Sequence, residues 1–128
     1  MKTEIKEIEV NGIKYIPKDS ASELANPNTE GLKPVLIRSY AAGVHFGYLK
    51  SEEFTQAGKV VVLVNSRRVW YWEGAASLSQ MALEGVKSPD KCKFSVQIEL
   101  NEIVNVIETI PLTENAFINL SNVPIWKK

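Results

Sequence analysis

Hydrophobic and polar residues alternate at the start of the chain. Residues 4–17 read EIKEIEVNGIKYIP, and two alternating runs flank the pair Asn11 and Gly12. This pair readily adopts the positive φ angles of a type I′ turn, so the pattern predicts a β-hairpin. Residues 18–34 contain only two leucines among Ser, Asn and Pro, which predicts a linker because so few apolar side chains cannot form a core. The chain then divides into a hairpin at 1–17, a linker at 18–34 and a main domain at 35–128.

Several segments of the predicted main domain have the composition of β-strands. The first two, VLIRSY and VHFGYLK, are separated by the turn AAG and predict an antiparallel pair. The next, KVVVLVN, is continuously apolar and predicts a central strand buried on both faces. RRVWYW, at residues 67–72, follows as a fourth strand. Alternation along it predicts two faces, one with Arg68, Trp70 and Trp72 and the other with Arg67, Val69 and Tyr71.

Capping signals predict one or two short helices. Ser77 is followed three residues later by Gln80, a spacing at which both side chains accept hydrogen bonds from free amides at a helix start. We expect a helix over residues 78–84, closed by Gly85. Thr113 could cap a second helix. That helix would turn three apolar residues inward, Ala116, Phe117 and Leu120.

Two more segments, FSVQIEL and EIVNVIETI, have strand character, although the second could be helical on propensity alone. A chain of 128 residues is the usual length of one domain. The elements together predict an α+β fold, a small antiparallel β-meander sheet with one or two short helices, plus the amino-terminal hairpin.

Charge and cysteine content limit the classes of binding partner and the cellular compartment that we expect. Fifteen Lys and Arg balance fifteen Asp and Glu, so no overall positive field favours long DNA or RNA. Cys92 is the only cysteine, which excludes an internal disulfide and a multi-cysteine metal cluster. No apolar stretch approaches the ~20 residues of a membrane span, and the first residues lack a signal-peptide core. We expect a cytoplasmic protein with no membrane partner.

No pattern of catalytic residues stands out. His45 is the only histidine, so a catalytic triad or zinc site built on it would lack a visible second member. The sequence has no P-loop, dinucleotide fingerprint, zinc-protease helix or nucleophile elbow. We therefore expect a binding protein rather than an enzyme, with no cofactor and no metal. A lone strand histidine is more often structural than functional, but His45 could still line a pocket.

The segment RRVWYWEGAASLSQ, residues 67–80, combines three features of a nucleotide site. Its two arginines supply forked donors for phosphate, and its two tryptophans supply flat faces that stack on a base. The predicted helix start adds free backbone amides and the hydroxyls of Ser77 and Ser79. The alternative is ordinary packing, with the tryptophans in the core, the arginines at solvated strand ends and Ser77 acting only as a cap.

The two preceding strands carry basic and aromatic residues that could contribute to the same binding site. Arg38 and Tyr40 share a face of one strand, and Phe46 and Tyr48 share a face of the next. Ordinary sheet packing would explain these aromatic residues equally well. The candidate ligand-binding residues are Arg38, Tyr40, His45, Tyr48, Arg67, Arg68, Trp70, Trp72, Ser77 and Ser79.

The blocks VLIRSYAAGVHFGYL, RRVWYWEGAASLSQMALEGV and KFSV resemble a family of small uncharacterised proteins encoded by bacteriophages and prophages. The resemblance covers roughly Pro34 to Pro111, and the block from the tryptophans to the helix is its most specific part. It implies a phage accessory protein without implying an established activity. The hairpin and the carboxy-terminal segment fall outside it.

Small phage proteins without catalytic motifs often antagonise host defence, and some unrelated families do so by sequestering a cyclic nucleotide or a cyclic ADP-ribose signal. By this analogy we expect a homo-oligomeric anti-defence protein in the cytoplasm of the host bacterium that binds a small anionic nucleotide without cleaving it. Two alternatives stay open. The chain could inhibit a host defence enzyme by surface contact, with exposed tryptophans as anchors, or it could hydrolyse the same signal.

Overall fold

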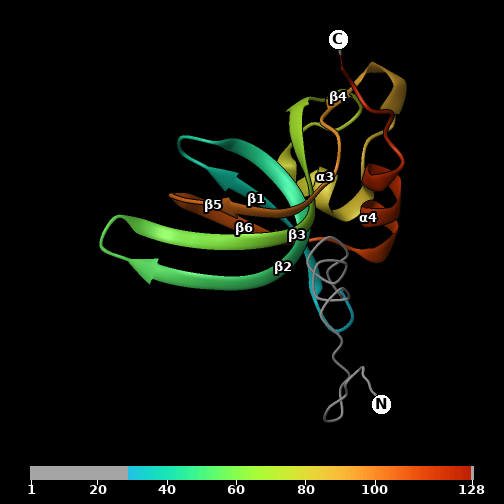
Figure 1. The fold of residues 1–128 in the computed structure, drawn as a ribbon. Helices are drawn as coiled ribbons and strands as arrows, with labels where there is room; N and C mark the ends of the chain where they lie inside the picture. The colour runs from blue at the N-terminus through green and yellow to red at the C-terminus, as the bar shows by residue number, and fades with distance from the viewer. Residues whose placement is uncertain (1–28, 128) are drawn as a thin grey trace, which may run out of the picture.

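The computed structural model describes residues 29–127, which form six β-strands and two α-helices (Figure 1). The predicted hairpin at 1–17 and most of the predicted linker lie outside the described residues. In chain order the elements are β1 (Lys33–Ser39), β2 (Gly43–Thr55), β3 (Gly58–Tyr71), α3 (Leu78–Glu84), the 3₁₀ turn η1 (Pro89–Lys91), β4 (Lys93–Phe94), β5 (Ile98–Ile103), β6 (Val106–Pro111) and α4 (Glu114–Ser121).

The strands form one antiparallel sheet, as the sequence predicts. β1, β2 and β3 are a meander, β4 and β5 both pair with β3, and β6 pairs with β1. In the sheet, β3 and β6 are separated by β2 and β1, yet Lys59 Nζ on β3 donates to Thr109 Oγ1 on β6 at 3.2 Å. The sheet therefore curls so that β3 and β6 approach each other across its inside, and the helices cover its convex face (Figure 1).

Each side of the curled sheet carries its own apolar cluster. We call the one inside the curl the concave cluster; its buried members are Val35, Ile37, Val61, Leu63, Ile103 and Val106. The helix-side cluster joins the convex side to α3 and α4; its buried members are Leu36, Phe46, Val69, Met81, Ala82, Val86, Cys92, Phe94, Leu112, Ala116, Leu120 and Val123. The two clusters alternate along β1, which is therefore buried on both faces.

Strand β3 is one long strand, so the prediction of two separate strands at 59–65 and 67–72 is wrong. The break that the sequence indicates is a β-bulge, because Phe46 and Tyr48 on β2 face Arg67 and Val64, which leaves one extra residue on β3. Asn65 adopts a φ of 54° within this bulge. Gly47 lies opposite, where a Cβ atom would come within 3.0 Å of the Val64 carbonyl oxygen. The absence of a side chain at this position lets the bulge and β2 approach closely.

Both predicted helices are confirmed, with their caps. Ser77 Oγ accepts from the Gln80 amide at 3.1 Å, and the Gly85 amide donates to the Met81 carbonyl at 2.8 Å. Gln80 Oε1 accepts from Ala76 rather than from the capping residue itself. At α4, Thr113 Oγ1 accepts from the Ala116 amide at 3.0 Å. The three residues predicted to point inward do so: Ala116 and Leu120 are buried in the helix-side cluster, and Phe117 packs against it.

The last two predicted strands are divided differently in the structure. FSVQIEL is split between β4 and β5, and EIVNVIETI turns at Val104 and Asn105 to become the end of β5 and most of β6. Asn105 has a φ of 53°, which allows this tight reversal. In the described part of the chain, no helix has the length and apolarity to cross a membrane.

Candidate functional site

A surface pocket of about 350 Å³ lies where the β1–β2 turn meets the end of β3. Its volume is near the lower end of the range of small-molecule sites. Its walls are two residues of the turn, the first two residues of β2, three residues of β3 and a tryptophan just beyond that strand. The lining residues are Ala41, Ala42, Gly43, Val44, Arg68, Val69, Trp70 and Trp72.

Arg68 provides the charge of this pocket. Its side chain is exposed, and among residues 29–127 no carboxylate lies within ion-pair distance of it. Its backbone is fixed on both sides by Ser95, since the Arg68 amide donates to Ser95 Oγ at 2.8 Å and the Ser95 amide donates to the Arg68 carbonyl at 2.9 Å. A rigid strand therefore presents a guanidinium whose donors are available to an anion.

Trp70 and Trp72 line the pocket from different sides of the sheet, so the prediction that they share a face with Arg68 is wrong for Trp72. On β4, the neighbours Phe94 and Lys93 face Val69 and Tyr71, so a second bulge places an extra residue on β3 at Trp70. Trp70 is 62% exposed, whereas Trp72 packs against the helix-side cluster. Trp72 Nε1 donates to the Ala75 carbonyl at 3.2 Å. Trp72 therefore forms a fixed wall of the pocket, whereas the ring of Trp70 is open to solvent.

Two buried polar side chains hold the turn that forms the opposite wall. Ser39 Oγ donates to the Val104 carbonyl at 2.7 Å and accepts from the Ala42 amide at 3.1 Å. His45 Nε2 lies 2.9 Å from the Ala42 carbonyl. The Tyr40 amide also donates to the Asn105 carbonyl, which ties the turn to the β5–β6 connection. The turn is therefore positioned before any ligand arrives.

His45 does not line the pocket, but it holds the turn that forms one pocket wall from inside the sheet. It is 1% exposed, and burial lowers the pKa of its imidazole despite the hydrogen bond to Ala42; the charge of Arg68 lowers it further. A neutral ring must carry its proton on Nε2 to donate to the Ala42 carbonyl, which leaves Nδ1 to accept from Asn101 Nδ2 at 3.5 Å. His45 is thus a neutral positioning residue.

Arg67 is not a phosphate contact, and the prediction that assigned it this role is corrected by its surroundings. The side chain is 4% exposed and lies on the helix side, with its guanidinium carbon 5.3 Å from the centre of the Phe94 ring. Burial lowers its pKa. Its donors are directed to backbone carbonyls, at Ser95 (2.8 Å), Leu120 (3.2 Å), Ser121 (3.4 Å), Val123 (2.8 Å) and Pro124 (3.4 Å). Arg67 thereby clamps the end of α4 and the segment after it to the sheet.

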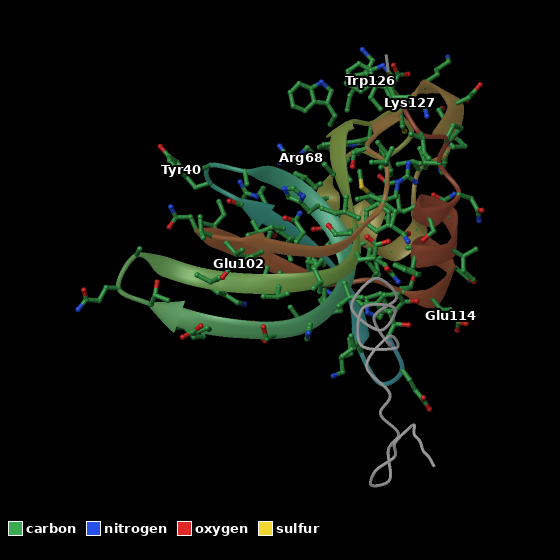
Figure 2. All side chains as sticks on the ribbon, viewed as in Figure 1. Tyr40, Arg68, Glu102, Glu114, Trp126 and Lys127 are labelled. Carbon is green, nitrogen blue, oxygen red and sulfur yellow. The ribbon has the colours of Figure 1, made fainter. Side chains whose placement is uncertain are left out.

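The other candidate residues lie away from the lining. Arg38 forms an ion pair with Glu108, Nε to Oε1 at 3.1 Å. Tyr48 packs on Phe117 with ring centres 4.8 Å apart, as a packing residue would. Tyr40 is 83% exposed at the tip of the β1–β2 turn (Figure 2). Ser77 caps α3, and Ser79 is exposed in its first turn.

Sequence reasoning missed the contribution of the turn at Ala41, Ala42 and Gly43 to the site. The run AAG indicates a turn, and Gly43 indeed has a φ of 83°. Small apolar residues at a turn carry no chemical signal, however. Their role follows only from the register of β1, β2 and β3, which places Val44 opposite Val69 and so brings the turn over Arg68.

The described residues define a small antiparallel β-domain with an open pocket that places the Arg68 guanidinium beside two indole rings. The family described as Domain of unknown function (DUF6948) matches residues 32–120, which is more than half of the chain, and the chain belongs to this family. No curated protein and no solved structure matches the chain.

Proposed function

We propose that this protein binds a small anionic nucleotide in the pocket beside Arg68 and holds it without cleaving it. The observation that carries the proposal is the exposed Arg68 guanidinium, without an ion-pair partner among residues 29–127, at the rim of a pocket walled by Trp70 and Trp72. Hydrogen bonds to a charged group contribute about 1.5 to 3 kcal/mol. Stacking of a base on an aromatic ring contributes about 1 to 3 kcal/mol more.

The fixed turn supports the choice of a small ligand. Ser39 and His45 hold the turn at Ala42 from inside the sheet, so little conformational entropy is lost when a ligand is enclosed. The opposite wall is held by the bond from Trp72 to Ala75. Trp70 is then the side chain with freedom to adjust to a base.

Binding is a better proposal than hydrolysis because of the chemistry of the lining. Arg68 is the one titratable side chain among the described residues that line the pocket. A guanidinium stays protonated near neutral pH and cannot act as a general base. The buried imidazole of His45 already donates its proton to the Ala42 carbonyl, so it is committed to structure.

We further propose that the protein acts as a homo-oligomer in the cytoplasm of a host bacterium and withdraws an immune nucleotide signal there, as an anti-defence protein of a phage would. This part of the proposal rests on the resemblance of the sequence to phage and prophage proteins and on the analogy with sequestering proteins. The pocket chemistry supports only the binding step.

The test is calorimetric titration of the wild-type chain and Arg68→Ala with 3′,5′-cyclic AMP, 5′-AMP and ADP-ribose. We expect at least one of these ligands to bind the wild type and to lose about 1.5 to 3 kcal/mol of affinity in Arg68→Ala. Arg68→Lys should recover only part of it, because an ammonium cannot form two parallel bonds. Ligand released by denaturation should have an unchanged mass. Equal affinity for wild type and Arg68→Ala would contradict the assignment, and a changed mass would favour hydrolysis.

A second candidate function is inhibition of a host enzyme by surface contact. It is favoured by the exposed aromatic residues at two hairpin turns, since Tyr40 is 83% and Phe54 is 81% exposed. Aromatic side chains of this kind often anchor protein interfaces. If none of the nucleotides shifts the melting temperature, and a host enzyme is inhibited by wild type but not by a Tyr40→Ser, Phe54→Ser variant, this second function replaces the first.

A further inference from the structure

The bulge at Trp70 changes which residues share the side of the sheet that faces away from the helices. Val69 and Phe94 are paired and both buried in the helix-side cluster. Their neighbours Arg68 and Lys93 therefore point to the other side, because side chains alternate along strands. Tyr71 pairs with Lys93 and so shares its side. The extra residue at the bulge, Trp70, is exposed and lines the pocket together with Arg68.

Lys93 is held between two aromatic rings on this side. Its Nζ atom lies 5.9 Å from the centre of the Tyr71 ring and 5.3 Å from the centre of the Trp126 ring. Among residues 29–127, no carboxylate forms an ion pair with it. The two rings flank the ammonium, and no carboxylate of the described residues occupies its donors, which can therefore meet an anion.

The Tyr71 side chain and the Trp126 backbone beside Lys93 are each held by a hydrogen bond. Tyr71 donates its hydroxyl proton to Glu73 Oε2 at 2.6 Å, and this bond raises the pKa of the phenol. The Trp126 amide donates to the Phe94 carbonyl at 2.9 Å, next to a parallel bridge between Phe94 and Ile125. The end of the chain is thereby laid beside β4. Tyr71 and Trp126 remain 44% and 40% exposed, so each keeps free surface for stacking.

The two cations are close enough to serve one ligand. Arg68 precedes Tyr71 by three residues, which is about 10 Å along a strand, and Lys93 lies on the adjacent strand. Figure 2 shows Arg68 and Trp126 at the same end of the molecule, together with Lys127. The arrangement therefore repeats one motif twice, a cation next to an exposed aromatic ring: Arg68 with Trp70, and Lys93 with Tyr71 and Trp126.

We propose that Lys93, Tyr71 and Trp126 form a second nucleotide subsite continuous with the pocket, so that the preferred ligand carries two bases and two phosphates. This inference rests on the proposed function of the pocket and specifies its ligand class as a dinucleotide. Arg68 and Trp70 hold the first nucleotide, and Lys93 with its two rings holds the second. A single base and phosphate would leave the second cation and its rings unused.

The experiment compares cyclic di-AMP with 5′-AMP by calorimetry at fixed ionic strength, using wild type, Lys93→Gln and Trp126→Ala. Lys50→Gln is the matched control, since Lys50 is exposed on β2 and the change in charge is the same. We expect cyclic di-AMP to bind wild type at least tenfold more tightly than 5′-AMP. Lys93→Gln and Trp126→Ala should lower the affinity for cyclic di-AMP at least fivefold and change that for 5′-AMP less than twofold. Lys50→Gln should leave both unchanged.

The outcomes separate this inference from the proposed function on which it rests. Equal affinity of wild type for the two ligands, or equal loss of both in Lys93→Gln, would overturn the second subsite and leave the Arg68 pocket intact. If neither ligand nor any mononucleotide binds, the proposed function itself fails. Tighter binding of a ten-nucleotide single strand than of cyclic di-AMP would also overturn the dinucleotide class, in favour of a polymer. Unchanged melting temperatures of the variants verify that they fold.

Discussion

His45 Nε2 lies 2.9 Å from the carbonyl oxygen of Ala42, so a buried imidazole holds in place the turn that forms one wall of the pocket. Burial lowers the pKa of this imidazole below its ordinary value of 6.5. The pocket wall is thus held by His45, whose protonation opposes folding, and we therefore expect stability to depend on pH.

Stability should fall on mild acidification because of His45. The pKa of His45 is lower in the folded chain than in the unfolded chain, so at a pH between these two values the unfolded chain binds one more proton. The stability that neutral His45 contributes is therefore fully present above about pH 6.5 and is lost as the pH falls toward the pKa of the folded state. The slope can reach about 1.4 kcal/mol per pH unit. Urea unfolding between about pH 5 and 7.5 measures it, above the range where most carboxylates titrate. His45→Gln should give a flatter profile, and an equally steep one would assign the effect to another group.

The neighbours Arg67 and Arg68 should respond in opposite ways to the same substitution. Arg67→Met leaves the buried Val123 carbonyl without its Arg67 donor and leaves the Leu120 carbonyl with only the Val123 amide. Each unsatisfied buried group costs about 1 to 3 kcal/mol, and the other carbonyls that Arg67 binds lose a donor as well. We expect a loss of at least about 3 kcal/mol in the free energy of unfolding. Arg68→Met should change it by less than about 0.5 kcal/mol, because the side chain is exposed. Chemical denaturation of both variants checks this, and similar losses would contradict the assignment.

Trp70 and Trp72 should likewise separate binding from folding. Trp72→Ala removes a ring packed against the helix-side cluster and a hydrogen bond, so we expect a loss of about 3 kcal/mol in stability. Trp70→Ala should leave the melting temperature nearly unchanged and lower nucleotide affinity by about 1 to 3 kcal/mol. Melting curves with parallel titrations distinguish the two. A Trp70→Ala variant that binds normally would remove this ring from the site.

Asn119 should matter more than its position on a short helix suggests. Its side chain accepts from the Val86 amide at 2.8 Å and donates to the Val86 carbonyl at 3.0 Å, which joins α4 to the segment after α3. We expect Asn119→Ala to cost about 1 to 3 kcal/mol, because Val86 is buried and loses both partners. Asn122→Ala, which removes an exposed bond to Ile118, is the control and should cost less than about 0.5 kcal/mol. Equal effects in urea unfolding would show that burial of the bond is irrelevant.

The helix boundaries follow from sequence because caps are local. Ser77 and Thr113 each bond an amide three residues ahead, so the signal and its structural result lie within one turn. The curled sheet is harder to predict. Its bulges at Asn65 and Trp70 depend on which residues face them on β2 and β4, and that pairing is absent from the local pattern.

The candidate site could be predicted only in part, again because the pairing between strands is absent from the local pattern. Strand alternation places Arg67 and Arg68 on opposite faces, and this holds in the structure. It does not tell which face is buried. That choice depends on carbonyls from the end of α4 and the segment after it, which lie 53 to 57 residues further along the chain. The bulge at Trp70 then adds Tyr71 to the exposed side and removes Trp72 from it.

The clamp formed by Arg67 also bears on how the end of this chain can change during evolution. Arg67 lies inside the segment that matches the family, whereas Ser121, Val123 and Pro124 lie beyond its end at residue 120. The clamp contacts these residues only through backbone carbonyls, which every amino acid provides. One arginine can therefore keep the last segment in place while its exposed side chains are replaced, although Val123 stays buried in the helix-side cluster. Relatives could vary Trp126, and with it the ligand preference that we propose, without losing the fold.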